Sequence, residues 1–176
     1  MADKQQIILD NIFSRKSVRH FMESNVSRDQ LELLMKAGMA APSAKNQQPW
    51  AFIGITDHAI LDPLADGLPF AKMLVQAGGA IVVCGDLNKS DPARKEYWVQ
   101  DCSAAAQNVL LAAEAMGLGA VWTALYPYQE RYSLVQEAAS LPDHIIPLCI
   151  IPIGFPTGED LPKDKFIAEN IHWNRW

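Results

Sequence analysis

Two prolines and a run of polar side chains limit what the chain can fold into around segment 41–50, which reads A-P-S-A-K-N-Q-Q-P-W. Pro42 and Pro49 lack a backbone donor, and each biases the residue before it towards an extended conformation. The segment therefore favours neither a helix nor a central strand. A helix-like pattern precedes it and the apolar run 51–55 follows it. We therefore predict a stiff polar loop between two ordered elements.

The side chains of this loop suggest two different roles. Ser43, Asn46, Gln47 and Gln48 all carry hydrogen-bonding groups. Such a loop suits a planar ring rich in heteroatoms, because that ring needs donors and acceptors at fixed positions. The alternative is a connecting loop whose amides cap nearby backbone groups. Composition alone does not decide between the two.

A basic segment lies upstream of this loop. Residues 14–21 read S-R-K-S-V-R-H-F, so that Arg15, Lys16, Ser17 and Arg19 bring several cations and a hydroxyl close together. Guanidinium groups match phosphate oxygens in a bidentate geometry, which favours a phosphate-binding site. The alternative is a solvated basic patch, the more common role of a short charged run.

Taken together, the two segments resemble the nitroreductase family of FMN-dependent enzymes. That family has an R-x-S-x-R-type motif on or after its first helix, followed by a P-S-x-x-N-x-Q-P-W loop, and both stand here in that order. The resemblance covers nearly the whole chain. It implies an α+β fold with a central, mostly antiparallel sheet flanked by helices. It also implies an intertwined homodimer that uses FMN as cofactor and NAD(P)H as transient reductant.

The resemblance also assigns cofactor-binding residues to several parts of the chain. Segment 161–165, L-P-K-D-K, is similar to the family's late L-P-K-x-[KR] motif, whose basic pair binds the FMN phosphate together with the early arginine. The expected cofactor-binding residues are Arg15, Lys16, Ser17, Arg19, Pro42, Ser43, Ala44, Asn46, Lys72, Trp122, Thr123, Ala124, Leu125, Lys163 and Lys165.

Within this set the resemblance implies two roles for the basic residues. Arg15 and Ser17 would hold the phosphate together with Lys163 and Lys165. Arg19 would lie beside the N1–C2 edge of the flavin ring, where a cation stabilises the reduced cofactor.

The remaining residues would surround the ring. The ring would lie against the loop 42–46, and backbone amides of 122–125 would contact its N5 and O4 atoms. Many relatives carry a glutamate where Ala124 stands. Lys72 matches a second family lysine near the ring, but it equally fits a lysine whose stem lies over an apolar helix. Trp122 equally fits a core aromatic.

The resemblance implies an enzyme without a catalytic side chain. NAD(P)H would reduce FMN and leave, and a nitroaromatic, a quinone or a similar planar acceptor would then enter the same pocket in a ping-pong cycle. The histidines are scattered and the cysteines lack metal-binding spacing, so we expect no metal. One alternative is a non-catalytic module that binds or senses flavin. Another is a relative with different flavin chemistry, such as reductive dehalogenation.

Length and charge bound the other possibilities. The 176 residues suggest one domain, 1–176, in which 155–176 is a C-terminal extension whose aromatic end docks on a partner subunit. A net charge of −5 argues against a nucleic-acid partner. No apolar run approaches the length of a membrane span. The cysteines sit among apolar residues, which indicates buried free thiols and predicts a reducing, cytoplasmic location.

Helical and strand patterns mix without strict alternation, which indicates an α+β fold. Ser27 and Gln30 form a capping-box pattern at a helix start. Pro147 and Pro152 predict edge pairing or breaks in the strand that contains them. Helices are expected at 3–13, 27–41, 57–64, 92–116 and 130–139, and strands at 51–56, 80–85, 120–123 and 145–153.

Overall fold

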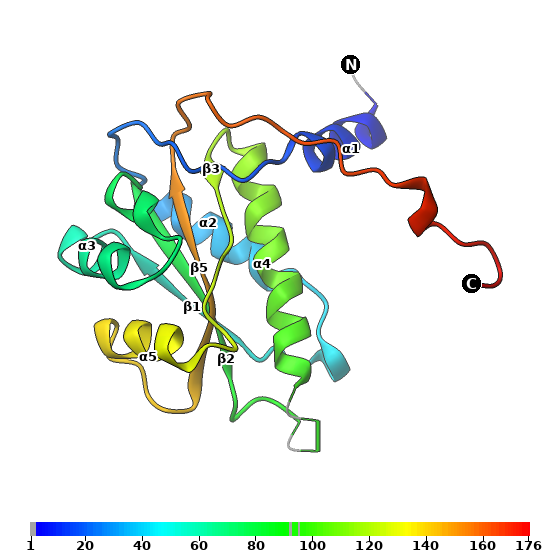
Figure 1. Cartoon of the computed structure of the whole chain (residues 1–176). Helices are drawn as coiled ribbons and strands as arrows, with labels where there is room; N and C mark the ends of the chain where they lie inside the picture. Colours follow the sequence, from blue (N-terminus) through cyan, green and yellow to red (C-terminus); the bar gives the residue numbers. More distant parts are fainter. Residues whose placement is uncertain (1–2, 92, 95) are drawn as a thin grey trace.

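The computed structural model describes residues 3–91, 93–94 and 96–176 of this chain. They form an α+β fold in which helices cover both faces of a central sheet (Figure 1). Every strand pairing within these residues is antiparallel, in the order β1-β2-β5-β3, with β4 also pairing with β5. This confirms the predicted fold class. The strands are β1 (Trp50–Ile55), β2 (Gly79–Asp86), β3 (Gly119–Ala120), β4 (Thr123–Ala124) and β5 (Ile145–Gly154).

Two of the helices begin at caps that the sequence indicates. The Ser27 hydroxyl accepts a hydrogen bond from the Gln30 amide, and the Gln30 side chain accepts one from the Ser27 amide. The Asp57 carboxylate accepts a bond from the amide of Ala59. The helices are α1 (Lys4–Ser14), α2 (Arg28–Met39), α3 (His58–Gly67), α4 (Tyr97–Ala115) and α5 (Gln129–Ala138), with short 3₁₀ turns η1 (Ala44–Asn46), η2 (Lys72–Val75) and η3 (Ala168–Asn170). Within the described ranges, no helix combines the length and apolar character that crossing a bilayer requires.

The sheet separates two hydrophobic clusters because side chains alternate between its faces. Ile81 and Val83 of β2 pack with buried residues of α2 and α4. Their neighbour Val82 points to the other face, where it packs with buried residues of α3 and α5. Helix α4 therefore lies on one face of the sheet, with α2 packed beside it (Figure 1).

The three cysteines are buried free thiols, as predicted. Burial raises the pKa of Cys102 to about 12 and raises the pKa of Cys84 and Cys149 further. A thiol with so high a pKa holds almost no thiolate at neutral pH, so these side chains serve the core rather than chemistry.

Strand β5 corrects the prediction for its two prolines. It is a central strand, paired with β2 on one side and with β3 and β4 on the other, so the edge position was wrong. The predicted irregularities do occur. Pro147 lies opposite Cys84, where the register with β2 shifts. Pro152 lies where the other ladder is interrupted between β3 and β4.

Two other boundaries differ from prediction. The strand expected at 120–123 is divided into β3 and β4, which pair with separate parts of β5. The long helix begins at Tyr97 rather than at 92, and positions 92 and 95 lie outside the described residues. Before Tyr97, the Asp91 carboxylate accepts a bond from the Ala93 amide, and this local turn competes with a helical start.

A close backbone approach at Gly78 gives a testable stability prediction. A Cβ added there would lie 2.4 Å from the Ser24 carbonyl oxygen, and the Val26 amide donates to the Gly78 carbonyl at 3.1 Å. Gly78→Ala must displace backbone atoms. We therefore expect the free energy of unfolding to fall by about 2 kcal/mol and the melting temperature by roughly 5 °C. Gly54→Ala is the matched control, because its Cβ would meet only the flexible end of Met35. Equal melting temperatures for the two variants would contradict the prediction.

Candidate functional site

A cavity of about 480 Å³ lies between the basic segment and the C-terminal tail. The segment is held by Val18, whose amide donates to the Ala120 carbonyl and whose side chain packs directly over Gly119. Because Val18 is buried, its neighbours Ser17 and Arg19 face the cavity. The wall consists of Lys16, Ser17, Arg19, Glu159, Asp160, Leu161, Pro162, Lys163 and Lys165. The structure thus brings the two basic segments together from opposite ends of the chain.

Lys16 and Arg15 of the basic segment differ in their surroundings. The Lys16 ammonium lies 3.2 and 3.4 Å from the carboxylate oxygens of Glu114, near the end of α4. Lys16 therefore anchors the segment to α4 while it also lines the cavity, and its role in cofactor binding stays a prediction. Arg15 caps the C-terminal end of α1. Among the described residues its guanidinium has no ion-pair partner, so its charge is available to an anion.

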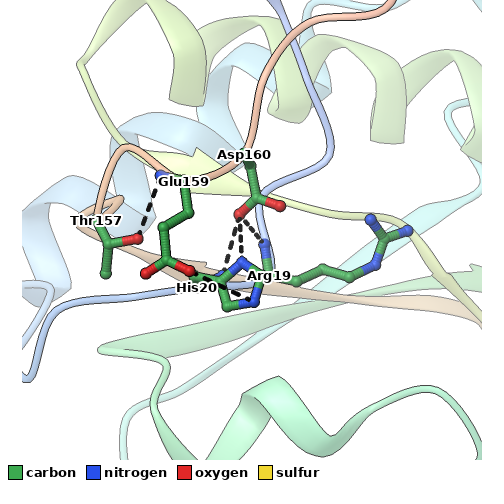
Figure 2. Close-up of polar contacts among 5 residues, drawn as sticks. All are labelled: Arg19, His20, Thr157, Glu159 and Asp160. Atoms are coloured by element: carbon green, nitrogen blue, oxygen red, sulfur yellow. Dashed lines mark hydrogen bonds and ion pairs between the residues drawn. The ribbon is translucent and has the colours of Figure 1, made fainter.

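Asp160 joins the two walls of this cavity (Figure 2). Its Oδ2 atom accepts bonds from the backbone amides of Arg19 and His20, at 2.8 and 3.1 Å. The same oxygen lies 3.1 Å from His20 Nδ1. Figure 2 shows the Arg19 guanidinium pointing away from this contact.

These bonds determine the titration of Asp160. Burial alone raises the pKa of its carboxyl group, but the Arg19 and His20 amides and the His20 ring together lower that pKa below its usual range. The stabilisation is therefore complete above the pKa of an unfolded aspartate. It is lost as the pH falls through the lower pKa of the folded state.

The polar loop forms a second cavity, of about 370 Å³, at the other end of α4. The Ala44 amide donates to the Asp101 carboxylate at 2.9 Å, and the Gln48 amide donates to the Ser43 hydroxyl at 3.0 Å. Lys45, Asn46 and Gln48 adopt positive φ angles. Non-glycine residues rarely adopt this conformation, and such strain concentrates at functional sites. The cavity is lined by Pro42, Ser43, Ala44, Tyr97, Gln100, Asp101 and Ala104.

The two cavities are far apart within one chain. The basic segment contacts α4 at Glu114 and the loop contacts it at Asp101. Because a helix rises 1.5 Å per residue, these contacts are about 20 Å apart along its axis. One chain therefore does not bring the two predicted halves of the site together.

An apolar surface is exposed beside the first cavity. Helix α1 has no buried residue, and Ile8 and Phe13 on it are exposed. The tail runs past α1 and away from the sheet (Figure 1). Within the tail, Trp173 is 83% exposed and Trp176 is 101% exposed. Exposed apolar side chains gathered in this way are typical of surfaces that contact another molecule.

Comparison with known proteins identifies the fold family. The sequence model of the nitroreductase family matches residues 12–71 and 69–155. The chain belongs to the nitroreductase family. A crystal structure from Bacteroides thetaiotaomicron VPI-5482, provisionally named NADH dehydrogenase/NAD(P)H nitroreductase, is 49% identical, with a TM-score of 0.91 over 100% of both chains.

Other nitroreductases extend this comparison. A protein of Archaeoglobus fulgidus with the same provisional name is 38% identical over 96% of this chain and 98% of its own length. The crystal structure of a provisionally named nitroreductase of Desulfovibrio desulfuricans in complex with FMN is 28% identical. Its TM-score is 0.82 over 100% of this chain and 99% of that one.

The remaining nitroreductase residues predicted to bind cofactor lie in different settings. Leu125 is fully buried and its amide donates to the Leu148 carbonyl at 3.0 Å, and its flavin contact stays a prediction. Thr123 is buried, whereas Ala124 is exposed on β4. Trp122 packs against the core cluster. The Lys72 ammonium pairs with Asp66 at 3.1 Å on the surface.

Sequence reasoning missed the carboxylates that organise this nitroreductase site. Asp101 showed a local signal, since it is an acidic residue in an alanine-rich apolar helix and is 8% exposed. Glu114 and Asp160 showed none, because their partners lie far away in the sequence. Among the described residues, no group of three metal-ligating side chains is close enough to hold an ion.

Proposed function

We propose that this chain is an FMN-dependent NAD(P)H oxidoreductase that reduces nitroaromatics, quinones or similar planar acceptors. Family membership and the names of its relatives support an NAD(P)H-dependent flavin oxidoreductase, and the FMN complex of the Desulfovibrio relative supports the cofactor. The observation that carries the proposal is the cavity of about 480 Å³ between two basic segments.

The residues around this cavity fit a phosphate group. Arg19, Lys163 and Lys165 supply cations, and Ser17 supplies a hydroxyl. Arg15 is not part of this wall but directly precedes Lys16 and Ser17 of it, and we include its guanidinium on the basis of the family motif. Charge-assisted bonds of this kind are the strong ones in proteins. These side chains would hold the FMN phosphate, with Arg19 turned towards the ring.

The complete site requires a second copy of the chain. The polar loop and the basic cavity lie at opposite ends of α4. If two copies pack with their α4 helices antiparallel, the loop of one copy meets the basic cavity of the other. Two-fold symmetry then completes two sites at once. The proposed assembly is a homodimer, in which the extension 155–176 docks on the partner.

The chemistry needs little from protein side chains. When bound, FMN supplies the hydride transfer between NAD(P)H and the acceptor, which use the same pocket in ping-pong order. The chain holds the phosphate and presents the polar loop to the ring edge, and we assign no catalytic side chain. Ala124 puts a methyl group where many relatives carry a carboxylate. We also place the protein in the cytoplasm, because buried free thiols suit a reducing compartment.

A visible absorption spectrum of the purified protein tests this function. We expect flavin bands, and we expect them to bleach on anaerobic addition of NADH or NADPH. Bands that persist would favour a non-catalytic flavin-binding module. No bands, even after FMN is supplied, would overturn the proposal.

A second addition to the reduced protein tests the acceptor. Recovery of the bands with a nitroaromatic or a quinone, under the same anaerobic conditions, is the expected result. Recovery with a halogenated aromatic alone would instead favour reductive dehalogenation.

A further inference from the structure

The tail is attached to its own chain at few points before it reaches the two basic residues. The Thr157 amide donates to the His20 carbonyl at 3.1 Å. Beyond Thr157, every hydrogen bond that joins residues 158–167 to another described part of the chain ends on the Asp160 carboxylate. The other bonds in this stretch are local turns within the tail. Asp160 is therefore the last fixed point before Lys163.

Asp160 is well satisfied where it lies. Its side chain is only 15% exposed, and three donors converge on a single oxygen. An ionised carboxylate only accepts hydrogen bonds, so the His20 Nδ1 atom must carry a proton in this contact. The carboxylate thus fixes the backbone on both sides of Arg19 and orients the His20 ring.

The position of Asp160 is electrostatically unfavourable for an anion site. It puts a negative charge into the wall of a cavity whose other charged groups include Arg19, Lys163 and Lys165. A bound phosphate would be repelled by this charge. This repulsion is offset if the carboxylate also holds the cavity wall in place. Its bonds to the Arg19 and His20 amides provide such a role.

We propose that Asp160 is a positioning residue that holds the two basic segments together. It thereby raises the affinity for the phosphate of FMN, although the carboxylate and the phosphate are both negatively charged. The inference rests on the proposed function, because FMN is the ligand. The contact holds Arg19 and Lys163 at a fixed separation although they lie far apart in the sequence. Without it, the exposed tail carries Lys163 and Lys165 on a chain with no fixed point after Thr157.

Two explanations of Asp160 predict opposite changes in FMN affinity for one substitution. If the carboxylate acts only as a charge, Asp160→Asn removes repulsion and FMN binds more tightly. If it positions the segments, Asp160→Asn replaces a charged acceptor by a weaker neutral one. FMN then binds about tenfold more weakly.

The experiment measures dissociation constants of the apoprotein for FMN and for riboflavin by flavin fluorescence. Riboflavin carries the same ring without the phosphate. We expect Asp160→Asn to weaken FMN binding about tenfold and riboflavin binding clearly less, because the loosened Lys163 and Lys165 would contact only the phosphate. Glu169→Gln is the matched control, because it removes the same charge from an exposed position of the same tail that does not line the cavity. It should leave FMN binding unchanged.

A second readout does not depend on the cofactor. Trypsin cleaves after lysine, so cleavage at Lys163 and Lys165 reports how firmly the tail is held. We expect several-fold faster cleavage in Asp160→Asn than in wild type or Glu169→Gln.

The outcomes separate the inference from the function on which it rests. Equal or tighter FMN binding by Asp160→Asn would overturn the positioning role. An equal loss for FMN and riboflavin would also overturn it, because the effect would then be general damage to the fold. If wild type itself binds no FMN, the proposed function fails, and unchanged trypsin cleavage would then refute the attachment as well.

Discussion

Replacing Arg15 with alanine is expected to weaken FMN binding about ten- to hundredfold while the fold survives. A guanidinium makes two parallel charge-assisted bonds to a phosphate, and losing such a contact corresponds to about 1.5–3 kcal/mol. Arg15 lies at the C-terminal end of α1, directly before Lys16 and Ser17 of the cavity wall. Unlike Lys16, which is committed to Glu114, it is not needed to hold that segment on α4.

Titration of the apoprotein with FMN, followed by flavin fluorescence, measures this loss. Arg15→Lys keeps the charge but not the planar fork, so we expect an intermediate affinity. Arg131→Ala is the matched control, since it removes a guanidinium that lies 3.8 Å from the Tyr128 ring centre on a different helix. If Arg15→Ala binds FMN as well as the Arg131→Ala control does, the phosphate assignment is wrong.

Most of the fold could be predicted because its signals are local. The capping box at Ser27 and the cap at Asp57 involve residues within one helical turn. The edge position predicted from the prolines of β5 was wrong because their effect is not local. Whether a missing amide disrupts a strand depends on the neighbouring strands, and here the irregular points of both ladders lie at Pro147 and Pro152. That information is not contained in β5 itself.

The candidate site was predictable only in part. Clusters of basic and amide side chains are visible in the sequence, and the fold does bring the two basic segments to one cavity. What a cluster does not show is its carboxylate partners. Lys16 meets Glu114 across 98 residues, and the Arg19 amide meets Asp160 across 141 residues. These distant contacts decide which cations remain available to a ligand.

Loss of the two terminal tryptophans is expected to weaken the proposed dimer on the order of a thousandfold. Trp173 and Trp176 are almost fully exposed on one chain, and the Trp176 ring lies 4.0 Å from that of His172. Buried interface tryptophans commonly contribute about 2 kcal/mol each, and two of them correspond to about three powers of ten in the dissociation constant. Sedimentation of Trp173→Ala/Trp176→Ala over a range of concentrations measures the change.

The control is Phe70→Ala, which removes an exposed aromatic at 81% exposure from a turn between α3 and η2. It should leave the association constant unchanged, and an equal effect of both variants would refute the docking of the tail.

The double variant should also lose FMN on dilution, because each proposed site uses the loop 42–46 of one copy and the basic cavity of the other. By linkage, added FMN should then drive the weakened dimer back together. A monomer that binds FMN with wild-type affinity would contradict the shared site, even if the tail proved essential for association.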